Sequence, residues 1–187
     1  MFRRRPAPDI QPEWLIVGLG NPGKEYIHTR HNIGFLALDT FAKTLEADWQ
    51  VNKKLHGEIA KGKIGRSVLI LLKPNTFMND SGEAVQAALA FYKLTPTDLI
   101  VVHDDKDIFL GETRVQIDRG PAGHNGVRSI IEMIGTQNFT RIRIGVAPKE
   151  QKIADTADFV LGKFNTEETK QFPTIFEHVA QELKSLV

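Results

Sequence analysis

Short apolar runs alternate along this chain with segments in which apolar residues recur at helical spacing. The runs end at glycine or at polar residues, and they cover Leu15–Val17, Val68–Leu72 and Leu99–Val102. Continuous apolar runs of this length are typical of strands that are buried on both faces. In contrast, the apolar residues of Ile33–Leu45 fall on one face of a helix.

The remaining segments continue this alternation of predicted strands and helices. Further strands are expected over Gly57–Gly62, Arg66–Lys73, Glu112–Ile117, Arg141–Val146 and Phe159–Leu161. Further helices are expected over Asp80–Lys93, over Asn125–Ile134 and near the C-terminus, where Pro173 suits the first helical turn. Within Glu112–Ile117, the polar side chains Arg114 and Gln116 are expected to point outward and the aliphatic ones inward.

Interleaved strands and helices predict an α/β fold, a single domain with a mixed, mostly parallel central sheet and helices on both faces. A chain of 187 residues has the size of one domain with a sizeable core. Residues 1–13 contain three arginines and three prolines and are expected to form a flexible tail. The folded domain is therefore expected to span residues 14–187.

The composition excludes several kinds of protein. The sequence has no cysteine, which excludes a disulfide framework, a thiolate metal site and a cysteine nucleophile. The longest apolar runs fall far short of the roughly 20 residues that span a bilayer, and the N-terminus lacks the apolar core of a signal peptide. We therefore expect a cytoplasmic protein with no membrane partner. The net charge of +1 does not by itself indicate a nucleic-acid-binding protein.

Three glycines after the first predicted strand, Gly18, Gly20 and Gly23, match the G-x-G-x-x-G pattern of dinucleotide-binding proteins. That pattern also needs a helix that begins at its third glycine and an acidic residue at the end of a second strand. Here the loop continues beyond Gly23, and the acidic residue at the expected separation, Asp39, falls within the first predicted helix. Nucleotide binding is therefore not favoured.

Three of the six histidines lie where a predicted strand or helix meets a loop. They are His31 beside Asn32, His103 beside Asp104, and His124 beside Asn125. The chain contains neither a closely spaced metal motif such as H-x-H or H-E-x-x-H nor the G-x-S-x-G serine motif. What remains is a histidine base, an orienting carboxylate and neutral amides that position a substrate. A metal-dependent hydrolase built on His31, Asp104 and His124 is an alternative.

Four sequence blocks in a fixed order carry a stronger signal than any single residue. They are G-L-G-N-P-G with Tyr26 and T-R-H-N, then T-F-M-N, then H-D-D-K-D, and then G-H-N-G followed by R-I-R-I-G. In this order and spacing, the stretch from Trp14 to about Lys163 resembles bacterial-type peptidyl-tRNA hydrolase. The resemblance implies a monomeric α/β enzyme, without metal or cofactor, that hydrolyses the ester between a peptide and the 3′ ribose of tRNA and so recycles the tRNA.

The resemblance also implies roles for individual residues of this chain. His31 is implied to be the catalytic base, Asp104 the carboxylate that orients it, and Asn21 the residue that senses a blocked amino group. The implied groove for the peptide and the 3′ end is lined by Tyr26, Phe77, Met78, Asn79, His124 and Asn125. Arg114 and Arg143 occupy positions similar to the family's clamp on tRNA phosphate.

The chain departs from the usual family pattern at three places. Lys106 stands where an apolar residue is usual, and Pro121 lies in a loop with fewer glycines than usual. The third departure is A-P-K-E after R-I-G-V, in place of glycine and Arg-Pro. We expect Lys106 to face solvent or phosphate. These differences keep open a second function, that of a non-catalytic RNA-binding protein with the same fold.

Overall fold

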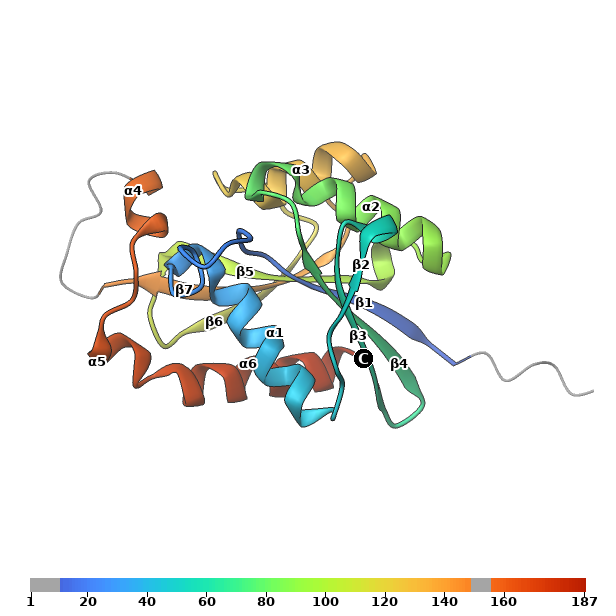
Figure 1. The fold of residues 1–187 in the computed structure, drawn as a ribbon, viewed down its shortest axis with the longest axis horizontal. Helices are drawn as coiled ribbons and strands as arrows, with labels where there is room; N and C mark the ends of the chain where they lie inside the picture. The colour runs from blue at the N-terminus through green and yellow to red at the C-terminus, as the bar shows by residue number, and fades with distance from the viewer. Residues whose placement is uncertain (1–10, 149–155) are drawn as a thin grey trace, which may run out of the picture.

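A seven-stranded sheet forms the centre of the computed structural model, which describes residues 11–148 and 156–187 (Figure 1). Its strands are β1 (Glu13–Gly18), β2 (Gln50–Asn52), β3 (Gly57–Ile64), β4 (Ser67–Pro74), β5 (Leu99–Phe109), β6 (Thr113–Ile117) and β7 (Thr140–Ala147). They lie in the order β2-β3-β4-β1-β5-β7-β6. The central strands β4, β1, β5 and β7 are parallel, whereas β3 and β6 are antiparallel to their central neighbours. The predicted α/β class, with a mixed and mostly parallel sheet, is confirmed.

Helices cover both faces of this sheet, as predicted. The α-helices are α1 (Ile33–Thr44), α2 (Ser81–Tyr92), α3 (Asn125–Ile134), α4 (Thr156–Leu161), α5 (Thr166–Thr169) and α6 (Phe172–Leu186), and the 3-10 helices are η1 (Arg30–Asn32), η2 (Lys53–Leu55), η3 (Met78–Asp80) and η4 (Pro96–Asp98). α1 and α6 lie on one face, and α2 and α3 on the other (Figure 1). Pro173 lies in the first turn of α6. Among the described residues, no helix has both the length and the apolar character needed to cross a membrane.

The apolar runs are continuous because each central strand contributes to two cores. Successive side chains of a strand point to opposite faces of the sheet. In β1, Ile16 packs with α1 and α6, whereas Leu15 and Val17 pack with α2 and α3. Full burial of one such aliphatic side chain stabilises the fold by roughly 1.5–3 kcal/mol. The two cores thus fix the ends of the parallel strands, where the polar loops begin.

The short segment Phe159–Leu161 is not extended, so that prediction is wrong. It belongs to the helix α4. Val160 is buried on its inner side, whereas Leu161 is exposed. Three apolar residues are too short a window to separate the period of a strand from that of a helix.

Three side chains of β6 differ from the prediction: Val115 and Ile117 are exposed, and Gln116 is partly buried. Val115 and Ile117 are 43% and 56% exposed. Gln116 is half-buried instead, and its Oε1 accepts hydrogen bonds from Arg141 at 3.3 Å and from Arg143 at 3.1 Å. Because β6 is an edge strand with one neighbour, the arginines of β7 decide which of its faces is covered.

The N-terminal boundary lies slightly before the predicted one. β1 begins at Glu13, and the Pro12 carbonyl oxygen accepts a hydrogen bond from the Val68 N–H at 2.9 Å. Residues 1–10, which form most of the predicted flexible tail, lie outside the described residues. The sheet therefore includes a residue that was assigned to the tail.

Gly34 allows α1 to lie directly against the sheet. A Cβ atom at this position would approach the backbone of Leu19 to 2.7 Å and would come even closer to the Val102 carbonyl oxygen.

We expect Gly34→Ala to lower the free energy of unfolding by about 1–3 kcal/mol, because either α1 or the sheet has to move. Urea denaturation measures this change. Lys43→Ala, at an exposed position of the same helix, should change it by less than about 0.5 kcal/mol, and an equal effect of both variants would contradict the close approach.

Candidate active site

The predicted site residues meet beyond the carboxyl end of β1, beside β5. Contrary to the prediction, β5 does not end after Val102 but continues to Phe109, so His103 and Asp104 lie within the strand. Asn21 lies in the loop after β1, His31 in η1, Asp104 in β5 and His124 directly before α3. β1 pairs with β4 on one side and with β5 on the other, which opens a crevice at the carboxyl ends of the strands. A cleft of about 250 Å³ lies there; its lining includes His31, Asp104, Asp105, Lys106, His124, Asn125 and Val160.

A single carboxylate oxygen joins two histidines in this cleft. Asp104 Oδ1 lies 2.8 Å from His31 Nδ1 and 2.9 Å from His124 Nε2, and the Asp104 side chain is only 2% exposed. An ionised carboxylate only accepts hydrogen bonds, so we assign a proton to both ring nitrogens. The neutral His31 ring then carries its lone pair on Nε2. His124 Nδ1 accepts a hydrogen bond from the Val127 N–H at 3.3 Å and so caps α3.

Asp104 keeps its charge although it is buried. Burial by itself raises the pKa of a carboxylic acid. Here the charges of His31 and His124, together with their hydrogen bonds, outweigh burial and hold the pKa of Asp104 well below its usual value. Asp104 is therefore a carboxylate at neutral pH. It keeps a proton on His31 Nδ1 and stabilises the imidazolium that forms when Nε2 takes up another proton.

His103 packs behind this pair as a neutral ring. Its Nδ1 donates a hydrogen bond of 2.7 Å to the backbone carbonyl oxygen of Asp104, and its ring centroid lies 4.6 Å from that of His124. Burial, and next the charge of His124, hold the pKa of His103 well below its usual value. Because His103 stays neutral, it does not compete with His31 and His124 for the charge of Asp104.

Asn21 is held by hydrogen bonds to two other segments. Its backbone N–H donates to Asn32 Oδ1, and Asn32 Nδ2 donates back to its carbonyl oxygen, both at 2.9 Å. Asn21 Oδ1 accepts a hydrogen bond from the Met78 N–H at 2.7 Å. Since Oδ1 is already bonded, Nδ2 is the group that Asn21 offers to a ligand. The sequence placed Asn32 beside His31 but did not indicate that Asn32 holds the backbone of Asn21.

Two aromatic rings, from the loops that follow β1 and β4, lie against each other. Tyr26 and Phe77 meet edge to face with their centroids 6.5 Å apart, and Phe77 is 58% exposed. Asn79 and Asn125 are exposed as well. The Met78 side chain, in contrast, is buried. Of the predicted groove residues, His124 and Asn125 line the cleft, and Met78 contributes its backbone N–H to the position of Asn21. A groove that includes the others stays a prediction.

Known proteins are similar to this chain in sequence and in fold. A family model described as peptidyl-tRNA hydrolase matches residues 15–187. The chain belongs to the peptidyl-tRNA hydrolase family. The peptidyl-tRNA hydrolase of Mycobacterium ulcerans (strain Agy99) is 42% identical over 174 residues, which cover 92% of this chain and 90% of that relative. That of Sorangium cellulosum (strain So ce56) is 46% identical over 168 residues, with coverages of 89% and 75%.

A solved structure of this family agrees with the fold. The crystal structure of peptidyl-tRNA hydrolase from Acinetobacter baumannii matches this chain with a TM-score of 0.86 at 35% identity, and the match covers 97% of this chain and 91% of that one. The predicted family is thus confirmed, and this chain is a hydrolase. The comparisons do not favour the non-catalytic RNA-binding alternative.

Two arginines of this hydrolase face each other across the outer strands. Arg114 on β6 and Arg143 on β7 are register partners, so their side chains lie on one face of the sheet. Arg114 is exposed, as predicted, and lies 3.4 Å from Glu112. Arg143 is only 16% exposed, and its Nε donates to Asp105 Oδ2 at 2.6 Å. Each arginine thus has an acidic neighbour, and their role as a phosphate clamp stays a prediction.

Arg30 holds η1, which contains His31, to the C-terminal part of the chain. Its Nη2 donates to the two Glu168 carboxylate oxygens at 2.8 and 3.0 Å, and its Nη1 donates to the Lys163 carbonyl oxygen at 2.9 Å. Its guanidinium lies 4.6 Å from the centre of the Phe159 ring. These contacts fix α4 next to His31. Apart from the position of Arg30 in the T-R-H-N block, no pattern in the sequence predicts these contacts.

The loop between β6 and α3 is held in an unusual conformation. Asp118 and Ala122 have left-handed backbones, with φ of 52° and 48°. The buried Arg141 donates to the carbonyl oxygens of Arg119 and Gly120 at 3.2 and 3.1 Å. Arg141 remains charged, although burial, followed by the charge of a neighbouring arginine, lowers its pKa. The loop that precedes His124 is therefore held in place by Arg141 of β7.

The departures from the family pattern lie partly along the cleft. Lys106 lines the cleft, is 32% exposed and lies 2.9 Å from Asp107. Its contact with phosphate stays a prediction. The segment A-P-K-E begins with Ala147 in β7 and Pro148, and its last two residues lie outside the described residues.

The residues of the metal-dependent alternative also lie together. The ligand atoms of His31, Asp104 and His124 are all within 4.8 Å of one another. In the structure these residues are joined by the two hydrogen bonds of Asp104 Oδ1.

The low pKa of Asp104 makes the stability of the hydrolase depend on pH. Above the unfolded-state pKa of about 3.9, the ionised Asp104 makes its full contribution to the free energy of unfolding. This contribution is lost as the pH falls below that value. We expect Asp104→Asn to lower the free energy of unfolding by about 3 kcal/mol at neutral pH. The difference from the wild type should shrink between about pH 4 and pH 2. Denaturant titration across this range measures it. Asp107→Asn, at an exposed position, is the control, and a difference that is independent of pH would contradict a charged, buried Asp104.

Proposed function

We propose that this hydrolase cleaves the ester between a peptide and the 3′ ribose of tRNA, with His31 as the general base. The observation that carries the proposal is the bond from His31 Nδ1 to the buried Asp104 at 2.8 Å, which leaves Nε2 free to take a proton from water. The substrate class follows from the relatives, which are named peptidyl-tRNA hydrolases. The reaction would return prematurely released tRNA to translation.

An ester of ribose requires little more than an activated water. The ribose oxygen is a tolerable leaving group, and a positioned general base typically contributes about 10²–10⁴-fold to the rate. His31 Nε2 takes a proton from water as the water oxygen attacks the acyl carbon. The resulting imidazolium, stabilised by Asp104, then gives that proton to the departing ribose oxygen. The reaction is complete without a metal ion or a covalent enzyme intermediate.

The asparagines supply neutral hydrogen-bond donors to the acyl group. An amide N–H from Asn125 or Asn79 stabilises the oxyanion that develops on the carbonyl oxygen, a contribution of roughly 3 kcal/mol in other enzymes. Asn21 Nδ2 suits the carbonyl oxygen of a blocked amino group. A free ammonium group has only donors, so Asn21 would face it without a bond. This difference accounts for a preference for blocked substrates.

The tRNA arm of the substrate would lie over the outer strands. Arg114 and Arg143 share one face there, and Lys106 lines the cleft together with His31 and Asp104. Contacts with phosphate give affinity without reading the sequence, as a hydrolase that acts on many tRNAs requires. In this proposal the protein acts as a monomer in the cytoplasm.

Replacement of His31 tests the proposed base. We expect His31→Ala to lower kcat on N-acetyl-aminoacyl-tRNA by about 10²–10⁴-fold, because water is no longer activated, whereas the Kd for deacylated tRNA should stay unchanged. Single-turnover hydrolysis and a binding titration measure the two quantities. His178→Ala, an exposed histidine on α6, is the matched control. Loss of tRNA binding along with activity would indicate a structural histidine instead.

A further inference from the structure

His103 is a buried histidine of β5 that takes no part in the proposed hydrolysis. It is only 1% exposed and stands next to Asp104 in the chain. Its Nε2 has no hydrogen-bond partner among the described residues. A buried polar atom without a partner generally costs about 1–3 kcal/mol, a cost that a phenylalanine of similar shape would not carry. Packing alone therefore does not account for a histidine at this position.

The Nδ1–H of His103 replaces a neighbour that β5 loses at this point of the sheet. β1 pairs with β5 only up to Gly18 and Val102, and the next N–H, that of Leu19, donates to the Val102 carbonyl oxygen at 2.9 Å. Backbone groups two residues apart in a strand point to the same side, so the Asp104 carbonyl oxygen faces the side that β1 has left. His103 Nδ1 donates to this oxygen at 2.7 Å. The hydrogen bond thus continues the support of the β5 backbone beyond the end of β1.

The ring of His103 also supports His124. The rings of His103, His124 and His31 follow one another, with centroid distances of 4.6 Å and 4.8 Å. His124 lies in the middle, and its Nε2 donates to Asp104 Oδ1 at 2.9 Å. His103 therefore contacts two of the groups that define the place of the Asp104 carboxylate, namely the main chain of Asp104 and its second imidazole partner.

We infer that His103 is a positioning residue for the proposed hydrolysis of peptidyl-tRNA. It holds the main chain of Asp104 so that Oδ1 stays 2.8 Å from His31 Nδ1. The inference rests on the proposed role of His31 as the base and adds the residue that keeps the orienting carboxylate in place. A displacement of about 1 Å can cost about 100-fold in rate, so the hydrogen bond to the Asp104 main chain contributes to kcat.

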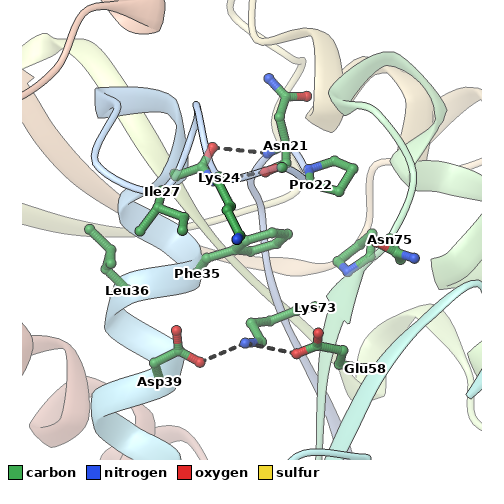
Figure 2. A pocket seen from close by; sticks show the side chains of 13 residues that line it. Asn21, Pro22, Lys24, Ile27, Phe35, Leu36, Asp39, Glu58, Lys73 and Asn75 are labelled. Atoms are coloured by element: carbon green, nitrogen blue, oxygen red, sulfur yellow. Dashed lines mark hydrogen bonds and ion pairs between the residues drawn. The ribbon is translucent and has the colours of Figure 1, made fainter. Parts of the chain in front are cut away.

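Asn21 is fixed independently of His103, from the β4 side of β1. Its backbone is bonded to Asn32, and its Oδ1 accepts from the Met78 N–H. A hollow of about 410 Å³ lies beside it, lined on the far side by Lys73 of β4 (Figure 2). β5, which carries His103, is the neighbour of β1 on the opposite side. A change at His103 should therefore lower turnover but leave the preference for a blocked amino group as it is.

The test compares two replacements of His103 that each keep one of its features. His103→Phe keeps a buried ring but removes the Nδ1–H donor, whereas His103→Asn keeps an N–H donor in the place of Nδ1 and removes the ring. We expect His103→Phe to lower kcat on N-acetyl-aminoacyl-tRNA by about 10–100-fold, with KM and the Kd for deacylated tRNA within about twofold of the wild type. His103→Asn should keep kcat within about threefold of the wild type. The stoichiometry of the tRNA titration gives kcat per folded molecule, so a loss of folded protein does not imitate a loss of turnover.

A double-mutant cycle with Asp104→Asn tests whether His103 acts through the carboxylate. In that background, His103→Phe should lower kcat by less than about twofold, because the effects of residues that act through one another are not additive. The matched control is His178→Phe, at an exposed histidine of α6, which should leave kcat unchanged.

An equal loss of kcat in His103→Phe and His103→Asn, or full activity of His103→Phe, would overturn the positioning role and leave His31 as the base. An undiminished loss in the Asp104→Asn background would overturn it as well. If the wild type released no tRNA from the blocked substrate, the proposed hydrolysis itself would fail, and the positioning role with it.

Discussion

The Asp104 carboxylate is buried in the middle of the sheet, and the rest of the site depends on keeping it paired. An unpaired charge in this position would cost several kcal/mol. Two imidazole rings remove that cost by donating to the same oxygen, His31 at 2.8 Å and His124 at 2.9 Å. The stability of the fold and the proposed reaction therefore both require the hydrogen bond between His31 and Asp104. The bond that keeps the carboxylate satisfied also sets the tautomer that frees His31 Nε2.

Each partner of Asp104 is held by a separate part of the fold. His31 stays near β5 because Gly34 lets α1 approach the strand and because Arg30 ties η1 to the segment after α4. His124 stays there because it caps α3 and because Arg141 holds the preceding loop. The site thus rests on the ends of helices and on strand β5.

The sequence predicted what local patterns determine and missed what depends on distant partners. The strand runs and the junction position of His31 followed from periodicity, whereas its link with Asp104 was implied by the resemblance to the family. The inward face of β6 did not, because it is set by the arginines of β7 that bond Gln116. The helix α4 was missed because three apolar residues fit either period. The hollow beside Asn21 combines three segments far apart in the chain, and no local pattern marks it.

In the proposed reaction, a histidine base acts without a metal ion on an ester whose amino group is blocked. The release of tRNA from N-acetyl-aminoacyl-tRNA and from the unblocked aminoacyl-tRNA, each with and without EDTA, tests this reaction. We expect rapid cleavage of the blocked substrate alone, at a rate that EDTA does not change. Equal cleavage of both substrates would contradict the role of Asn21, and loss of activity in EDTA would contradict His31 as the sole activator of water.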